Sequence, residues 1–325
     1  MKLQHLQAGD EIRVIAPSRS FAILKSEQVE IAQDRLESLG FKVTYGNNTS
    51  GHDEFFSSSI EERVQDIHDA FRDPNVKGIF TAIGGYNVNQ LLRYLDYDLI
   101  KQNPKVLCGF SDITALQWAI YQKTGLITYS GPHFSSFGVK YGFDYTLEYF
   151  KKAIMDSEDY EILPSDKWSD DPWYLDQEKR EFHEQGPFMV LQPGNAEGEV
   201  LAGNLGTLNL LQGTEFMPSI KDCILFIEDD EETHPLTFDR NLQSLLHLPD
   251  ATSIKALVIG RFQQDSGMTD YALEKIISSK KELEGIPVIA NVNFGHVHPF
   301  ATVPVGGRAL VKANGSGVEI KIILS

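Results

Sequence analysis

The alternation of short apolar runs with segments of helical period constrains the fold of this 325-residue chain more than any other feature. In the first half, runs rich in β-branched residues at 12–16, 76–83 and 105–110 end in turn signals, and helical patterns separate them. Continuous apolar strands between helices are typical of a mostly parallel sheet covered on both faces. The sequence therefore predicts an α/β fold whose site lies beyond the carboxyl ends of the strands.

Capping signals set the bounds of the expected helices in this half. Residues 26–39 carry apolar side chains at helical spacing, and Gly40 supplies a stop signal. Ser59 and Glu62 have the spacing of a capping box, which predicts that a helix begins after Ser59. A further helix is expected over 112–125, where it ends at a glycine.

The second half predicts a mixed α/β unit with an antiparallel part. A buried strand at 223–228 runs into a series of acidic residues, another strand covers 286–296, and the tail reads as a hairpin with Asn314-Gly315 at its turn. We expect three parts: an N-terminal domain over 1–155, an acidic linker and loop over 156–197, and a C-terminal domain over 198–325.

The stretch 156–185 is strongly acidic and also holds Trp168 and Trp173. Two interpretations stay open for it. It is a solvated connector between domains, or it is a loop that covers a substrate, because solvated connectors seldom carry tryptophan.

Composition excludes several classes of protein. The formal net charge is −17, and an acidic chain repels phosphate backbones, so we expect no nucleic-acid partner and no docking on anionic membranes. Apolar stretches are too short to span a membrane, and the first residues lack a secretory signal pattern. Cys108 and Cys223 lie in apolar runs and are interpreted as buried strand residues. The expected location is the cytoplasm.

Three polar residues stand at the ends of expected strands: Ser111, Glu228 and His296. A serine, a histidine and a carboxylate are the groups needed for nucleophilic acyl transfer, in which the imidazole activates the hydroxyl and the carboxylate orients the imidazole. Each has a plainer interpretation. Ser111 is also a good helix N-cap, Glu228 belongs to an acidic run, and His298 and His133 are rival histidines.

The strand–Gly-Phe-Ser–helix arrangement around Ser111 resembles a nucleophile elbow. Gly109 permits a sharp turn, and the N–H of Asp112 could hold an oxyanion together with a donor from the Gly84-Gly85 turn. The usual elbow has glycine two residues after the serine, whereas this chain has Ile113.

Five segments together resemble the LD-carboxypeptidase family of serine peptidases, and within it the microcin C self-immunity (MccF-like) branch. They are "AIGGYNVNQLLRYLD", "NPKVLCGFSDITAL", "GNLGTLNLLQGT", "ILFIEDDEE" and "FGHVHPFATVPVGG". The resemblance implies an N-terminal Rossmann-like parallel-sheet domain, a C-terminal swivelling β-rich α/β domain and a homodimer. It also implies Ser111 as nucleophile, Glu228 as acid, His296 as base, and an oxyanion hole formed by Gly85 and Asp112.

The resemblance also bears on the substrate. Many murein-cleaving members have Arg where this chain has Ile83 and Gly where it has Asn87, and "AIGGYN" is similar to the immunity branch. That branch implies an aromatic residue stacked on adenine, a role given to Trp173 rather than Trp168. Packing of either tryptophan against the core is the alternative. Tyr86 and Asn87 are expected to bind substrate as well.

The function expected is therefore a serine hydrolase that cleaves an amide bond in peptidyl- or aminoacyl-nucleotide substrates. The alternatives are a murein tetrapeptide LD-carboxypeptidase and a non-catalytic protein that binds small ligands. Neither a metal nor a cofactor is expected, because the sequence lacks H-E-x-x-H, G-x-G-x-x-G and G-K-[ST] spacings.

Overall fold

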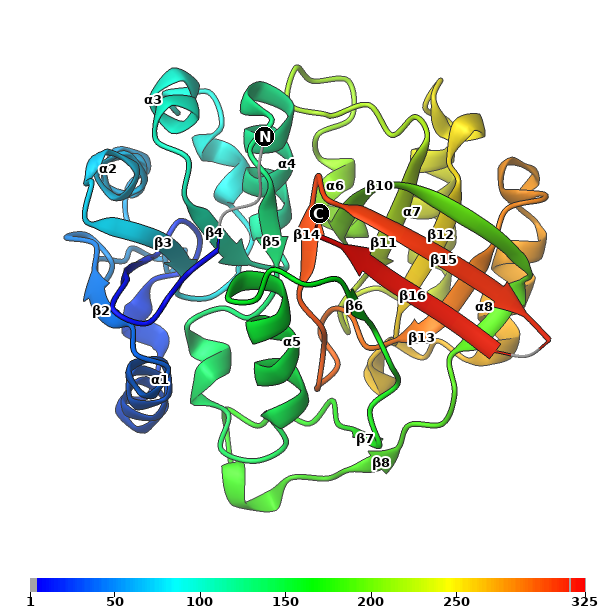
Figure 1. The fold of residues 1–325 in the computed structure, drawn as a ribbon, viewed down its shortest axis with the longest axis horizontal. Helices are drawn as coiled ribbons and strands as arrows, with labels where there is room; N and C mark the ends of the chain where they lie inside the picture. Colours follow the sequence, from blue (N-terminus) through cyan, green and yellow to red (C-terminus); the bar gives the residue numbers. More distant parts are fainter. Residues whose placement is uncertain (1–4, 316, 325) are drawn as a thin grey trace.

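Two β-sheets with helices packed around them organise the computed structural model, which describes residues 5–315 and 317–324. In Figure 1 the N-terminal half lies on the left, the C-terminal half on the right, and the segment between them passes below both. The mixed α/β architecture, with a parallel sheet followed by a β-rich domain, confirms the expected fold class. Among the described residues, no helix has both the length and the apolar character needed to cross a membrane.

The first sheet has six strands in the order β14-β5-β4-β3-β1-β2. All neighbouring strands are parallel except β14, which returns from the C-terminal part of the chain and pairs antiparallel with β5. The strands are β1 (Glu11–Ile15), β2 (Lys42–Tyr45), β3 (Val76–Thr81), β4 (Val106–Gly109), β5 (Thr128–Ser130) and β14 (Val303–Val305).

Helices follow the strands of this sheet much as the spacing predicts. The capping box is present, since the Ser59 hydroxyl accepts from the Glu62 N–H and the Glu62 carboxylate accepts from the Ser59 N–H. The segment after β3 forms the short 3-10 helix η2 (Val88–Leu91). The helices are α1 (Ser26–Ser38), α2 (Ile60–Arg72), α3 (Tyr97–Gln102), α4 (Ile113–Thr124) and α5 (Asp144–Ile154).

The second sheet has eight strands in the order β6-β16-β15-β10-β11-β12-β13-β9. Its centre, from β10 to β13, is parallel, and the flanking strands are antiparallel. The strands are β6 (Tyr160–Glu161), β9 (Met189–Gln192), β10 (Gly194–Asn204), β11 (Cys223–Glu228), β12 (Ala256–Gly260), β13 (Val288–Val292), β15 (Arg308–Asn314) and β16 (Gly317–Ile323), with helices α6 (Leu205–Asn209), α7 (Pro235–Leu246) and α8 (Asp270–Ser278).

Two details of the second half differ from expectation. The strand expected to run to His296 ends at Val292, so His296 lies in the loop that follows β13. The tail hairpin forms, but Asn314 still belongs to a strand, because it pairs with Gly317. The turn therefore begins one residue after the expected Asn314-Gly315 position. The segment 156–197 supplies β6 and β9 to the second sheet and a small hairpin, β7 (Lys167–Trp168) with β8 (His183–Glu184).

Helix α4 holds the two halves together. Its Trp118 is fully buried, and the indole N–H donates to the Ala202 carbonyl of β10 at 2.9 Å. Thr114 of the same helix accepts from the Asn204 N–H at 3.0 Å. A side chain at Gly203 would lie 2.3 Å from a Thr114 carbon, so this close approach requires glycine. The helix that follows Ser111 is therefore packed directly on the second sheet.

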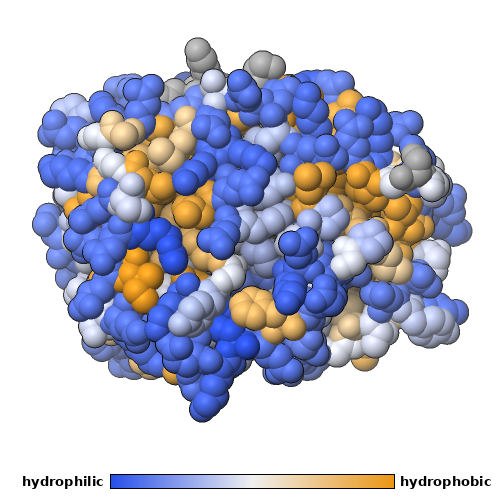
Figure 2. Space-filling view, turned by 60° about the horizontal axis from the view of Figure 1, so that its bottom comes forward, coloured by the Kyte–Doolittle hydropathy of each residue, from blue (hydrophilic) through white to orange (hydrophobic). Residues whose placement is uncertain are grey.

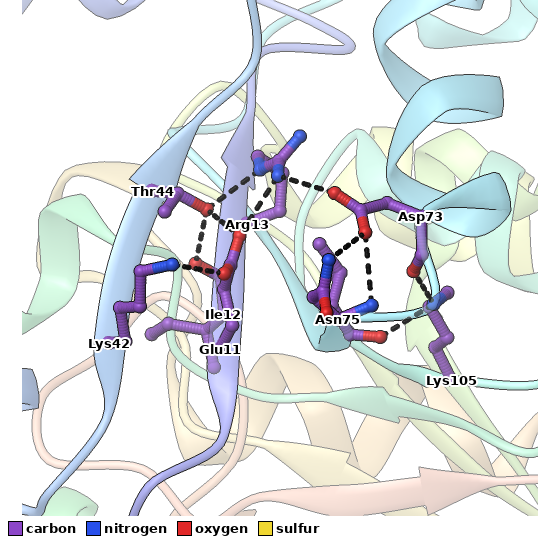
Figure 3. Close-up of polar contacts among 9 residues, drawn as sticks. Glu11, Ile12, Arg13, Lys42, Thr44, Asp73, Asn75 and Lys105 are labelled. Carbon is purple, nitrogen blue, oxygen red and sulfur yellow. Dashed lines mark hydrogen bonds and ion pairs between the residues drawn. The ribbon is translucent and has the colours of Figure 1, made fainter.

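A charged network closes the opposite end of the first sheet, where its strands begin (Figure 3). Glu11 is 8% exposed and accepts from Arg13 at 2.9 Å and from Lys42 at 2.7 Å. Arg13 also pairs with Asp73 at 3.1 Å. Elsewhere the surface is mostly hydrophilic, with separate hydrophobic patches, on the face shown in Figure 2.

Candidate active site

Ser111 lies on a sharp turn between β4 and α4. Its φ is 60°, in the left-handed region that non-glycine residues seldom adopt, which is the strained backbone expected of a nucleophile elbow. A Cβ at Gly109 would lie 2.2 Å from the Thr81 hydroxyl, so the strand can end beside β3 only with glycine there. The turn presents the Ser111 hydroxyl at the carboxyl end of the sheet.

The structure brings together Ser111, His296 and Glu228, which are far apart in the sequence. His296 Nε2 lies 3.0 Å from Ser111 Oγ, and His296 Nδ1 lies 2.5 Å from Glu228 Oε2. Glu228 is the last residue of β11 and is 2% exposed. The hydroxyl, the imidazole and the carboxylate thus form one continuous hydrogen-bonded series.

Two glycines make room for the Glu228 carboxylate. A Cβ at Gly295 would lie 2.4 Å from Glu228 Oε2, and one at Gly260 would lie 2.9 Å from Glu228 Cβ. Gly295 also has a φ of 99°, which an L side chain rarely adopts. The sequence "FGH" therefore has a steric basis, since the glycine before His296 lets the loop pass over the buried carboxylate.

Acidic neighbours set the proton affinity of His296. Burial lowers its pKa, but the Glu228 carboxylate, with additional charge from Asp230 and Asp229, raises it more, to about 9. Burial, together with the Glu228 charge, raises the pKa of Asp229 to about 7. Imidazolium at position 296 is thus strongly stabilised, as the transition state of acyl transfer requires.

Two backbone N–H groups close to Ser111 in the chain or on the neighbouring glycine turn have no hydrogen-bond acceptor among the described residues. Within the described residues, the N–H groups of Gly85 and Asp112 donate to no other group. A Cβ at Gly84 would lie 3.2 Å from Ser111 Oγ, so the glycine turn comes close to the hydroxyl. A Cβ at Gly85 would lie 2.4 Å from the Ser18 hydroxyl, which explains the second glycine. Two unused donors therefore belong to the backbone segments nearest to the serine.

The rival histidines do not bond to Ser111. His133 contacts the Thr81 hydroxyl at 2.7 Å, and burial, with a smaller effect of His296, lowers its pKa to about 3. Burial, followed by the charge of Arg180, lowers the pKa of His298 to about 3. Both rings are therefore neutral at physiological pH, and neither is placed to take the Ser111 proton.

The residues expected to bind substrate fall into two groups. Tyr86 is 61% exposed. Its hydroxyl, in the N-terminal half, donates to the carboxylate of Glu232 in the C-terminal half at 2.5 Å. Asn87 forms hydrogen bonds within the N-terminal half. Its amide oxygen accepts from Arg63 at 2.9 Å and its amide nitrogen donates to Ser57 at 2.9 Å, and the role expected for it in substrate binding stays a prediction. The sequence identifies residue 87 as a polar asparagine, but it does not identify Arg63 and Ser57 as its hydrogen-bond partners.

The two loop tryptophans have different surroundings. Trp173 meets the ring of His298 edge-on at 6.1 Å, and Ser169 of the same loop forms a backbone bridge with His298. Trp168 packs instead on His183 and under Arg261. Trp173 is therefore the tryptophan that lies against the segment carrying His296.

Sequence reasoning missed Ser18 and Arg63, which both contact the loops around the site. Ser18 follows β1, so the rule that sites form at the carboxyl ends of strands could have found it. Arg63 lies on α2 and carries no such signal. Among the described residues, no group of three or more His, Cys, Asp or Glu side chains is placed to hold a metal ion.

Comparisons with known proteins match both halves of the chain to one family. The model of the LD-carboxypeptidase N-terminal domain matches residues 12–131, and that of the C-terminal domain matches residues 197–311. The putative carboxypeptidase YocD of Bacillus subtilis is 53% identical, with 96% of each chain covered. The microcin C7 self-immunity protein MccF of Escherichia coli is 32% identical over 97% of this chain and 94% of its own. A probable murein peptide carboxypeptidase of Bacillus subtilis is 31% identical over 95% and 90%.

Solved structures show the same architecture. An MccF-like protein from Bacillus anthracis superimposes with a TM-score of 0.98 at 50% identity, covering 99% of both chains. MccF in complex with aspartyl sulfamoyl adenosine superimposes with a TM-score of 0.88 at 31% identity, covering 99% of this chain and 98% of its own.

Proposed function

The chain belongs to the LD-carboxypeptidase family, and from that membership and the site geometry we propose that Ser111, His296 and Glu228 form its catalytic triad. The family makes the chain a hydrolase of the serine peptidase type. The observation that carries the assignment of residues is the Ser111–His296–Glu228 hydrogen-bonded series, at 3.0 Å and 2.5 Å, which joins residues far apart in the sequence.

The proposed reaction follows from the roles of these groups. His296 accepts the proton of Ser111 as the hydroxyl attacks the substrate carbonyl, and Glu228 stabilises the imidazolium that forms. The N–H groups of Gly85 and Asp112 hold the oxyanion, an effect typically worth about 10²–10³ in rate per donor. His296 then protonates the leaving amine, and water releases the acyl group from Ser111.

The proposed substrates are peptidyl- or aminoacyl-nucleotides, whose amide bond would be cut in a detoxification reaction. Support comes from one relative, which is named a microcin C7 self-immunity protein and which has been solved in complex with aspartyl sulfamoyl adenosine. Trp173 supplies a half-buried indole beside the His296 segment, and an indole face stacks on any base with roughly 1–3 kcal/mol.

A substrate panel tests this proposal. Purified protein should release the amino acid from aminoacyl-sulfamoyl adenosine, and Ser111→Ala should abolish the release. Trp173→Phe should raise KM for the nucleotide substrate more than it lowers kcat. Release of D-alanine from a murein tetrapeptide with the sulfamoyl adenosine left intact would reverse the order of the two candidate substrates.

Murein peptides are the second candidate substrate, because a relative at 31% identity is named a probable murein peptide carboxypeptidase. A non-catalytic binding role is tested separately by a fluorophosphonate probe. A serine hydrolase should be labelled at Ser111, with labelling lost in Ser111→Ala and reduced in His296→Ala.

We also propose a homodimer, from the family resemblance alone, and the cytoplasmic location that is expected from the sequence. Light scattering on purified protein measures the mass directly, and a mass near 36.5 kDa would contradict the dimer.

A further inference from the structure

The carboxylate of Asp112 joins three loops at the carboxyl end of the first sheet. Asp112 directly follows Ser111, and it is 2% exposed. Its Oδ2 accepts from the Ser18 hydroxyl at 2.5 Å and from the Val88 N–H at 3.0 Å. Ser18 follows β1, Val88 follows the glycine turn after β3, and Asp112 itself follows β4.

Arg63 binds the same turn, but it donates hydrogen bonds to the turn's oxygen atoms, whereas Asp112 accepts one from an N–H of the turn. Its buried guanidinium donates to the Pro17 carbonyl at 3.1 Å, to Asn87 Oδ1 at 2.9 Å and to the Asn87 carbonyl at 3.4 Å. The anion of Asp112 thus takes an N–H of the turn, while the cation of Arg63 takes its oxygens. The Gly85 N–H is used by neither of them.

A turn with two glycines needs such support. Glycine adopts more backbone conformations than any other residue, so Gly84-Gly85 has little intrinsic preference for one direction of its N–H groups. Stabilisation of an oxyanion depends on donors that are already in place, and a displacement of about 1 Å can cost roughly 10² in rate. Burying a carboxylate is unfavourable unless hydrogen bonds compensate for the lost water, as they do here.

We propose that the Asp112 carboxylate is a positioning group that fixes the Gly84–Val88 turn, so that the Gly85 N–H converges with the N–H of Asp112 itself beside Ser111. This rests on the proposed function, since it gives both N–H groups a role at the oxyanion. One residue then supplies one donor through its backbone and holds the other through its side chain.

Asp112→Asn and Ser18→Ala test the proposal against a matched control, Asp66→Asn. Asp66 is also a buried carboxylate of the N-terminal half, 4% exposed, and it accepts from a backbone N–H, that of Asn48, at 3.0 Å. It does not contact the glycine turn. The measurements are the rate constant for labelling of Ser111 by a fluorophosphonate, kcat and KM for the panel substrates, and Tm.

In Asp112→Asn, labelling and kcat should fall at least about tenfold, with KM within about twofold, because only the tetrahedral state uses both donors. Ser18→Ala keeps the Val88 contact and should show a smaller fall of the same kind. In Asp66→Asn, Tm should fall while both rates stay close to those of the wild type.

Labelling at the wild-type rate in both Asp112→Asn and Ser18→Ala would overturn the proposal, and so would an equal fall of labelling in Asp66→Asn. If the wild type labels at Ser111 and Asp112→Asn slows the labelling, the positioning role stands even when no panel substrate is cleaved. That pattern would reject the proposed substrates alone.

Discussion

At the scale of single residues, the acidity around His296 should govern how activity depends on pH. Only neutral imidazole can accept the Ser111 proton, and its pKa is raised from 6.5 to about 9. Activity is therefore lost as pH falls below the raised pKa and recovered as pH rises through it. We expect kcat/KM to increase between pH 7 and 9. A midpoint near 6.5 would contradict this expectation.

Two variants separate the sources of that shift. Glu228→Gln removes the neighbouring charge and replaces the charged acceptor of the Nδ1 hydrogen bond with a neutral amide oxygen, so the midpoint should move to lower pH and kcat should fall. Asp230→Asn removes charge without touching the hydrogen bond, so it should move the midpoint less and leave the plateau value of kcat close to that of the wild type.

Gly295 offers a second prediction at this scale. In Gly295→Ala, the added methyl would lie 2.4 Å from Glu228 Oε2, which must displace the carboxylate that orients His296. We expect kcat to fall by roughly 10² or more. Gly285→Ala is the matched control, because its φ of 84° is similarly strained but nothing lies within 4 Å of the added atom. It should lower Tm while kcat is retained.

At the scale of secondary-structure elements, the network where β1, β2 and β3 begin predicts sensitivity to acid (Figure 3). Burial raises the pKa of Glu11, but hydrogen bonds from Lys42, Arg13 and Thr44 lower it more, from 4.5 to about 2. The stabilisation is fully present above pH 4.5 and is lost as pH falls towards 2. Glu11→Gln should lower the free energy of unfolding at pH 7 by roughly 3 kcal/mol at most.

Urea unfolding at several pH values checks this prediction. The difference between wild type and Glu11→Gln should shrink between pH 4.5 and 2. The control is Glu197→Gln, since Glu197 forms an exposed pair with Arg308 at 2.8 Å and should contribute less than about 1 kcal/mol. An equal effect of both substitutions would contradict the role given to the buried network.

At the scale of the whole molecule, the contact between α4 and β10 sets the distance between the serine and its base. Trp118→Phe removes the hydrogen bond to Ala202 and leaves unfilled volume at the junction, so the free energy of unfolding should fall by about 2–4 kcal/mol. Trp168→Phe, at a half-exposed indole, should cost less than about 1 kcal/mol. Similar losses would show that the junction contributes little.

The sequence alone determined much of the order of strands and helices, the capping box at Ser59, and the places of Ser111 and Glu228 at or just after the ends of strands. These depend on local spacing, because periodicity, glycine and capping residues act over a few neighbouring positions. The approach of the Gly84-Gly85 turn to Ser111 follows from the same rule for parallel sheets, since a Cβ at Gly84 would lie 3.2 Å from Ser111 Oγ.

Residue pattern alone left His133, His296 and His298 as rivals, and the tertiary structure places His296 beside Ser111. The tertiary structure also pairs Asn87 with Arg63 and adds β14 to the first sheet. In addition, it places the Asp112 carboxylate where it accepts from the Ser18 hydroxyl and the Val88 N–H. Each of these contacts joins residues more than twenty positions apart. Packing and burial choose such partners, and no short-range pattern in the chain records that choice.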